Sequence, residues 1–498
     1  MIRFCLTLTG FACVLSAFAK IEMGTPFSDG VILQRDADVP VWGCASPGCR
    51  VSVSFADAEI STVADADGEW VARLPRMSAS KEGRILRVEE RELGWFGSVT
   101  DVLEIGDVLV GEVWFASGQS NMECPVVGLH PHFRDGDGAL VSMMTDLPYV
   151  RFAKNVKQWS VKPTRAESSG WRRLERKSIS DCELSAVAYY YARELYLALD
   201  IPIGIVDSSW HGTNIDAWTP RCGYEDCDPS IRATAEYRVK EDWNEAADKQ
   251  APIVGAHQQP TVLFNAMVDS WAPMAMRGMI WYQGCSNGGE AQRYCAKMHA
   301  LYKGWSRRFD NANLKLYFVQ LAPFKSNWND LVAAQNRFVA EEPNAAIAVT
   351  ADVGNFCDVH PNRKEIVSRR LAVHALKRDY GRDIPEDCSP VFKSATFSGN
   401  SVCLTFDHVQ KWYVYDPAFS LEPPFEIRDV DGKWVAAKLQ NVDWRGNVKG
   451  EQLVVKAAEG VVASAVRYMG RPKTMGILYN QVALPLGPFS AERQKDCK

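Results

Sequence analysis

The sequence predicts an α/β protein in which a central parallel sheet is flanked by β-rich domains. Short strand-like segments between turn residues fill both ends of the chain. In the middle, apolar strand-like segments alternate with segments of helical spacing, which indicates a parallel sheet covered on both faces. The length of 498 residues supports several domains, because one hydrophobic core rarely grows past about 300 residues.

The composition excludes several classes of protein. Hydrophobic residues make up 47% of the chain and charged residues 23%, close to an average soluble protein and unlike a disordered, collagen-like or coiled-coil chain. The 56 Lys and Arg against 61 Asp and Glu give a net charge of −5. A nucleic-acid partner is therefore not expected, because such proteins usually present a basic face.

Residues 1–19 have the pattern of a secretory signal peptide: a positive charge at Arg3, an apolar stretch, and Ala17-Phe18-Ala19 as the cleavage site. The stretch is broken by Ser, Thr and Gly and is shorter than the ~20 residues of a membrane span. We expect cleavage after Ala19 and export to the periplasm or out of the cell, with no membrane span in the mature chain.

The domains follow from the pattern of elements. Residues 20–104 are expected to form a sandwich-like β domain, with strands at 39–43, 50–55 and 69–74. Residues 105–390 form the α/β domain, and residues 391–498 a closing β domain with strands at 401–406, 425–428, 452–455 and 465–468. Within the α/β domain we expect strands at 108–116, 201–206, 278–282, 315–320 and 345–350, helices at 184–199, 287–308 and 329–341, and a surface insertion at about 222–260.

The most informative segment is Gly118-Gln119-Ser120-Asn121-Met122, directly after a predicted buried strand. Ligand sites of open parallel sheets lie beyond the carboxyl ends of the strands. A serine at a glycine turn there is exposed and lies near the N–H groups of a helix N-terminus, as an activated nucleophile requires. Ser and Asn are also favoured helix caps, so this segment alone does not decide the function.

Three further segments follow predicted strands and supply complementary chemistry. They are residues 210–213 (WHGT), 281–287 (WYQGCSN) and 358–361 (DVHP). Serine, imidazole, carboxylate and N–H donors are together the groups needed for acyl transfer to a serine.

In these four segments the chain resembles the sialate O-acetylesterase family of carbohydrate esterases, within the SGNH-hydrolase superfamily. The family's GQSNM block is matched at residues 118–122 and its WGGT block, except at one position, at 210–213. Its WYQGESN block is matched at 281–287 with Cys285 in place of Glu, and its DIHPxxK block at 358–364 with Val359 in place of Ile. The flanking β regions are also similar, so nearly the whole mature chain is covered.

The resemblance implies an SGNH-type three-layer α/β/α catalytic domain and a serine esterase that acts on O-acetylated sialic acid or another acetylated glycan. It implies that Ser120 is the nucleophile, His360 the general base and Asp358 the carboxylate that orients it. No metal or organic cofactor is expected.

The resemblance also implies an oxyanion hole. Its donors would be the N–H groups of Ser120 and Gly212, with an amide of Gln283 or Asn287 as a further donor.

Two departures from the family pattern leave alternatives open. Many relatives have Asp three residues before the histidine, where this chain has Cys357, so Asp352 or a backbone carbonyl could replace Asp358. With Cys285 in place of the family's Glu, the chain either lacks a side chain that only supports the loop, or it has a site with different electrostatics. Cys285 is not expected to be the nucleophile, because no helix N-terminus or cation is assigned to activate it.

Two other functions remain alternatives. An acetyl-xylan or other polysaccharide acetylesterase would use the same residues, and a catalytically weakened carbohydrate-binding protein would keep the β domains without the activity.

Cysteines and histidines elsewhere suggest structural roles. Of the 14 cysteines, Cys44 with Cys49 and Cys222 with Cys227 are close enough in sequence to pair. No zinc spacing is present. The segment from His130 to Asp137 also fits no calcium or zinc spacing, so we interpret it as a polar surface loop.

Overall fold

The computed structural model describes residues 20–93, 97–126, 146–232, 255–415, 421–443 and 447–494. The predicted signal peptide, the segment from His130 to Asp137 and most of the predicted insertion lie outside these residues. Within them, no helix is long and apolar enough to cross a membrane. The chain divides into two compact units, the first formed by residues 1–129, 136–281 and 296–316 and the second by residues 130–135, 282–295 and 317–498.

The first unit begins with the β region that the sequence predicts. One antiparallel sheet has the order β1 (Glu22–Met23), β3 (Val39–Cys44), β6 (Glu69–Leu74). In a second sheet, β4 (Arg50–Phe55) pairs with β5 (Ala58–Val63) and with β7 (Ser80–Arg91). In β4 buried and less buried residues alternate, because successive side chains of a strand point to opposite faces.

The strand β8 (Val99–Gly118) runs for 20 residues out of this β region. Its first part pairs antiparallel with β7, and its buried second part pairs parallel with β2 (Ile32–Gln34) and β11 (Ile203–Ser209). The boundary at residue 104 that the sequence suggests lies inside this strand. Glu112 of β8 is fully buried and accepts hydrogen bonds from Gln34, Arg35 and Arg277.

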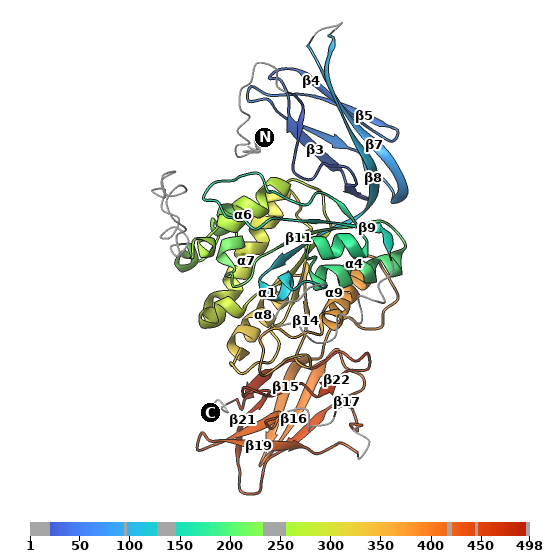
Figure 1. Cartoon of the computed structure of the whole chain (residues 1–498). Coiled ribbons are helices and arrows are strands. Elements are labelled where there is room, and N and C mark those ends of the chain that lie inside the picture. Colours follow the sequence, from blue (N-terminus) through green and yellow to red (C-terminus); the bar gives the residue numbers. More distant parts are fainter. Residues whose placement is uncertain are drawn as a thin grey trace, which may run out of the picture. The chain divides into compact units, whose positions relative to one another are not determined.

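The central sheet, which is drawn in Figure 1, is mixed according to its strand pairing. Its strand order is β10 (Arg172–Leu174), β9 (Leu147–Lys154), β11, β8, β12 (Gly278–Tyr282), β13 (Lys315–Val319), β14 (Ala345–Ala348). β11 is parallel to β8 and to β9, as expected, but β10 pairs antiparallel with β9. An all-parallel sheet was therefore the wrong expectation at this edge. The division into units passes through β12 and β13.

Of the three predicted helices, one has the predicted bounds and two begin later than predicted. α4 (Ala186–Leu199) is capped by the Ser185 hydroxyl, which accepts from the Ala188 N–H at 3.1 Å, and α8 (Asn329–Glu341) has the predicted bounds. α7 (Ala291–Arg308) begins four residues later than predicted. The preceding residues form the 3₁₀ segment η6 (Cys285–Glu290), in which Asn287 has non-helical dihedral angles.

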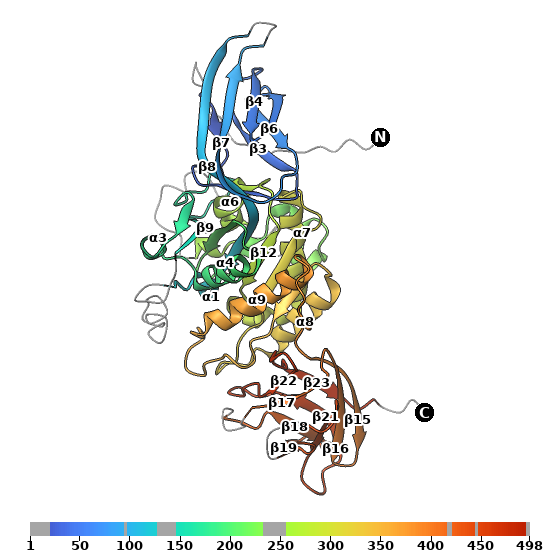
Figure 2. The same cartoon turned by 90° about the vertical axis from the view of Figure 1, so that its right-hand side faces the viewer.

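The second unit contains the C-terminal β region (Figure 2). Seven strands pair in the order β15 (Val391–Ser398), β16 (Ser401–Asp407), β20 (Leu453–Lys456), β19 (Trp434–Leu439), β18 (Phe425–Asp429), β21 (Ala463–Tyr468), β23 (Phe489–Glu492). β17 (Tyr413–Val414) pairs with β22 (Leu478–Tyr479). In the same unit, α8 and α9 (Lys364–Arg378) pack on β14.

The suggested cysteine pairs are not formed. Cys49, Cys222 and Cys227 are all free. Closeness in sequence was the only ground for those pairs, and it does not decide whether two side chains point toward each other.

Candidate active site

Ser120 lies at the turn that ends β8. Gly118 has a φ of +146°, which residues with a side chain rarely adopt. The one-turn helix α1 (Ser120–Glu123) follows, and its N-cap is Gln119, whose carbonyl accepts from the N–H of Met122 at 2.8 Å. Ser120 is thus the first residue of the helix rather than its cap, and its side chain is half-buried.

A buried polar network holds this turn. The Ser185 hydroxyl donates to the Met122 carbonyl at 2.5 Å, and the Ser185 N–H donates to the Asp207 carboxylate at 2.8 Å. Asp207 is fully buried and also accepts from Lys154 Nζ at 2.7 Å. This network was not predicted from the sequence. An acidic residue directly after the apolar 201–206 run was the available signal.

The Gly212 turn adjoins the end of β8. Ser209 of β11 pairs with Gly118, and the Trp210 N–H donates to the Gly118 carbonyl at 3.2 Å. Gly212 has a φ of +69° and lies in open space, so its backbone conformation, not crowding, favours glycine there. Its carbonyl accepts from the Gln258 side chain. Among the described residues its N–H has no partner, as an oxyanion donor requires.

The position at which this block differs from the family is His211. Its N–H donates to the Glu123 carboxylate, and its Nδ1 lies 3.3 Å from that carboxylate. Beside it, the His257 ring stacks on Trp210 with centroids 5.1 Å apart. Burial and the nearby His211 lower the pKa of His257. Polar and aromatic side chains therefore surround the Gly212 turn.

The amides of Gln283 and Asn287 form a buried chain of hydrogen bonds in the second unit. Tyr294 donates its hydroxyl to Gln283 Oε1 at 2.8 Å, Gln283 Nε2 donates to Asn287 Oδ1 at 2.7 Å, and Asn287 Nδ2 donates to Glu290 Oε2 at 2.7 Å. Both amides are fully buried. These bonds use one N–H of each amide and fix the orientation of both groups.

Cys285, in the same loop, is half-buried, and its thiol is reduced. The chain lacks the family's glutamate at this position. Glu290, five residues further on, supplies a carboxylate that accepts a hydrogen bond from the Asn287 amide. The preceding Gly284 has a φ of +149° and packs against Leu331 and Leu321, so the loop conformation is held without the glutamate.

Asp358 and His360 lie together. Asp358 Oδ1 is 3.1 Å from His360 Nδ1 and also accepts from the His360 N–H at 2.9 Å. The alternative carboxylate, Asp352, is instead paired through both oxygens with Arg370 at 2.7 Å. Asp358 is therefore the carboxylate in position to orient the imidazole, while Cys357 is exposed.

The predicted residues thus form three local groups. Ser120 and Gly212 belong to the first unit, and the Gln283–Asn287 and Asp358–His360 pairs belong to the second. Each group follows a central strand along the chain, namely β8 and β11, β12, and β14. Serine, amide, carboxylate and imidazole groups are suited to general-base and nucleophilic chemistry.

A cluster of residues away from these groups has the side chains of a metal site. In the second unit, the ligand atoms of Glu386, Cys388 and His408 lie within 4.8 Å of one another. Burial raises the pKa of the Cys388 thiol, and Arg378 donates to its sulfur at 3.1 Å. A protonated thiol beside a guanidinium is a poor metal ligand, and none of the candidate catalytic residues belongs to this cluster.

Comparison with known proteins identifies the family. The model of a family described as carbohydrate esterase, sialic acid-specific acetylesterase, matches residues 110–372, more than half of the chain. The sialate O-acetylesterase of Homo sapiens is 24% identical over 526 residues, covering 96% of this chain and 93% of that protein, and the mouse enzyme is 24% identical over 554 residues, covering 97% and 98%.

The fold is also that of a solved carbohydrate esterase. The crystal structure of a carbohydrate acetylesterase from Xanthomonas citri has a TM-score of 0.78 and 31% sequence identity, and the match covers 95% of this chain and 100% of that one. The chain therefore belongs to the sialic acid-specific acetylesterase family of carbohydrate esterases and is a carboxylic ester hydrolase.

Proposed function

We propose that this protein is an exported serine esterase that removes O-acetyl groups from carbohydrate, with sialic acids as its substrates. The observation that carries the proposal is the contact between Asp358 Oδ1 and His360 Nδ1 at 3.1 Å. With Nδ1 turned to the carboxylate, Nε2 is the nitrogen that takes the proton from a nucleophile. We further propose an SGNH-type three-layer catalytic domain and cleavage of the leader after Ala19.

The first half-reaction forms an acetyl-enzyme. Ser120 Oγ attacks the acetyl carbonyl carbon and gives its proton to His360 Nε2. The N–H groups of Ser120 and Gly212, with an amide of Gln283 or Asn287, stabilise the oxyanion, and one such donor is typically worth about 3–4 kcal/mol of barrier. The intermediate then collapses, and the sugar oxygen leaves with the proton from His360.

The second half-reaction releases acetate. A water molecule gives its proton to His360 Nε2 and attacks the acetyl-serine carbonyl carbon. The second tetrahedral intermediate expels Ser120 Oγ, which recovers its proton from His360. The enzyme is regenerated, and one ester bond has been exchanged for acetic acid and a free sugar hydroxyl.

Acetate release from O-acetylated sialic acid and from acetylated xylan tests the proposal. Ser120→Ala should abolish release with an unchanged melting temperature, and Ser61→Ala, which removes an exposed hydroxyl of β5, is the matched control. Full activity of Ser120→Ala would overturn the mechanism. Faster release from xylan would assign the polysaccharide substrate, and no release from either would favour a carbohydrate-binding protein.

A further inference from the structure

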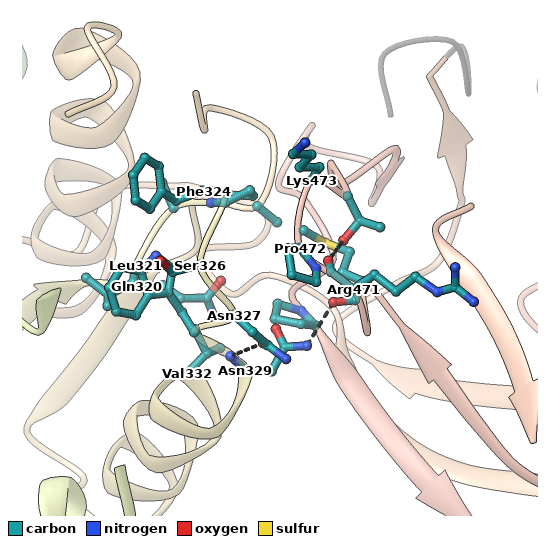
Figure 3. A pocket seen from close by; sticks show the side chains of 17 residues that line it. Gln320, Leu321, Phe324, Ser326, Asn327, Asn329, Val332, Arg471, Pro472 and Lys473 are labelled. Carbon is teal, nitrogen blue, oxygen red and sulfur yellow. Dashed lines mark hydrogen bonds between the residues drawn. The ribbon is translucent and has the colours of Figure 1, made fainter. Parts of the chain in front are cut away.

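The pocket of the second unit is too small for an organic ligand (Figure 3). It lies between the loop of residues 320–329 and residues 469–474, and its cavity of about 30 Å³ is far below the ~300–1,000 Å³ of ligand pockets. The Gly212 turn of the first unit, by contrast, is held by side-chain contacts that the proposed mechanism does not use. These contacts come from Glu123 and Gln258.

The Gly212 turn has little of its own to fix the direction of its N–H. Gly212 is exposed, has a φ of +69° and lies in open space among the described residues. Glycine adopts positive and negative φ with similar ease. An oxyanion donor must nevertheless point at the developing charge before the reaction begins, because its effect comes from preorganisation. Neighbouring groups therefore have to hold this turn.

The peptide group before the one that carries the Gly212 N–H is held at both ends. Its N–H, that of His211, donates to the Glu123 carboxylate. Its carbonyl, that of Trp210, accepts from the hydroxyl of the buried Thr213 at 2.7 Å. This peptide group is therefore fixed in direction.

The peptide group after it is held by Gln258, whose Nε2 donates to the Gly212 carbonyl. Gln258 Oε1 accepts from the Asn214 N–H at 3.0 Å, and the Gln258 carbonyl accepts from Asn214 Nδ2 at 2.9 Å. Because Oε1 is engaged by Asn214, the donor end of the amide faces Gly212. The peptide group that carries the Gly212 N–H thus lies between two fixed ones.

Glu123 also connects the Gly212 turn to the nucleophile. It is the last residue of α1, which begins at Ser120, and residues three apart in a helix lie on the same face. Its N–H donates to the Gln119 carbonyl at 2.9 Å, and its second carboxylate oxygen pairs with Lys157. All of these residues belong to the first unit. One side chain therefore sets the oxyanion donor relative to the helix that carries the nucleophile.

We propose that Glu123 and Gln258 are positioning residues for the oxyanion hole. They fix the two peptide groups that flank the Gly212 N–H and so hold this N–H toward the oxyanion. Both act through the backbone of the turn and not on the substrate. The inference rests on the proposed serine mechanism and adds to it two side chains outside the four segments from which the site was predicted.

Two substitutions at Glu123 test its contact with the turn. Glu123→Met keeps the length of the side chain and removes both carboxylate oxygens, whereas Glu123→Gln keeps an oxygen that can accept from the His211 N–H. The assay is hydrolysis of 4-nitrophenyl acetate by the full chain, which needs no sugar. In Glu123→Met, kcat should fall about 10- to 100-fold, less than the ~10²- to 10³-fold cost of removing an oxyanion donor outright. Glu123→Gln should retain most of the activity.

The substitution at Gln258 has a matched control. Gln258→Glu keeps Oε1 for the Asn214 N–H and replaces the Nε2 donor by an oxygen that repels the Gly212 carbonyl, so kcat should again fall about 10- to 100-fold. Gln440→Glu makes the same chemical change at an exposed glutamine of the C-terminal β region, whose Nε2 donates to the Lys438 carbonyl at 3.1 Å, and should leave kcat unchanged.

Two further readouts separate positioning from a merely structural role. KM should stay within about twofold in both variants, because the donor binds the oxygen strongly only when it carries negative charge. Methylboronic acid adds to Ser120 Oγ, whose proton passes to His360 Nε2, and the tetrahedral boronate places a negative charge at the oxyanion hole. Inhibition by this compound should weaken by about the same factor as kcat falls. A merely structural role would lower the melting temperature and leave kcat and this inhibition unchanged below it.

Full kcat in Glu123→Met or in Gln258→Glu would overturn the inference. A loss of kcat without weaker inhibition by methylboronic acid would also overturn it, as would an equal loss in Gln440→Glu. Failure of the proposed function is a separate result. It appears as absent acetate release from both sugar substrates while 4-nitrophenyl acetate is still hydrolysed, or as full activity of Ser120→Ala.

Discussion

Replacing Asp358 by Asn removes one charge and little else. Asp358 Oδ1 accepts from both the backbone N–H and Nδ1 of His360, and the amide oxygen of an asparagine can accept the same bonds. The variant therefore isolates the electrostatic stabilisation of the imidazolium that forms when His360 takes the proton from Ser120. We expect kcat to fall while the melting temperature stays the same.

The size of the effect follows from distance and exposure. Two unit charges about 4 Å apart interact by about 1 kcal/mol in water and about 4 kcal/mol at an effective dielectric constant of 20. The His360 and Asp358 side chains are 17% and 24% exposed, so the interaction lies between these limits. The loss of kcat should accordingly lie between roughly 5-fold and 10³-fold.

The assay is acetate release at saturating substrate, with Asp352→Asn as the control. Asp352 pairs with the buried Arg370, so its replacement should cost about 3–5 kcal/mol of stability and leave kcat intact below the melting temperature. An undiminished kcat in Asp358→Asn would refute the assignment of Asp358. A loss of kcat in Asp352→Asn instead would identify the other carboxylate as the orienting group.

Two further variants test the loop and the acid stability. Cys285→Glu should change kcat less than about tenfold, because Glu290 already holds the Asn287 amide and the interaction would be duplicated; a much larger gain would show that the natural site is impaired. Burial alone would raise the pKa of Asp387, but hydrogen bonding to His374 and the charge of Arg378 lower it. The stability from Asp387 is thus present above the unfolded pKa near 3.9 and is lost as the pH falls through the folded value. Below about pH 4 the melting temperature should therefore fall more steeply in the unmodified protein than in Asp387→Asn, and parallel curves would contradict this linkage.

Local patterns predicted the elements because the buried positions of a helix or strand recur with a fixed period and are occupied by apolar residues. The alternation in residues 50–55 and the apolar run at 278–282 became β4 and β12 with the expected bounds. The late start of α7 was not predictable from periodicity, because Gly284 and Asn287 adopt special backbone angles. The antiparallel pairing of β10 depends on contacts distant in sequence.

The candidate site was predictable as a set of segments but not as a set of contacts. The choice between Asp352 and Asp358 depends on which carboxylate Arg370 engages, and Arg370 lies 18 residues from Asp352. The buried Asp207 left only an acidic residue directly after an apolar run as a signal in the sequence, because its significance lies in which partners surround it.

Because β8 runs without a break from the N-terminal β region to the turn before Ser120, these two parts of the chain cannot be separated without cutting the strand. A chain shortened to begin at residue 105 would start inside that strand and would lack both β2 and β7, so all of the pairing of β8 to these two strands would be lost. Glu112 would keep Arg277 but lose Gln34 and Arg35, which leaves a buried carboxylate short of partners. A chimaera that takes its N-terminal β region from a relative would therefore have to take β2, β7 and β8 together, because no linker separates this region from the central sheet.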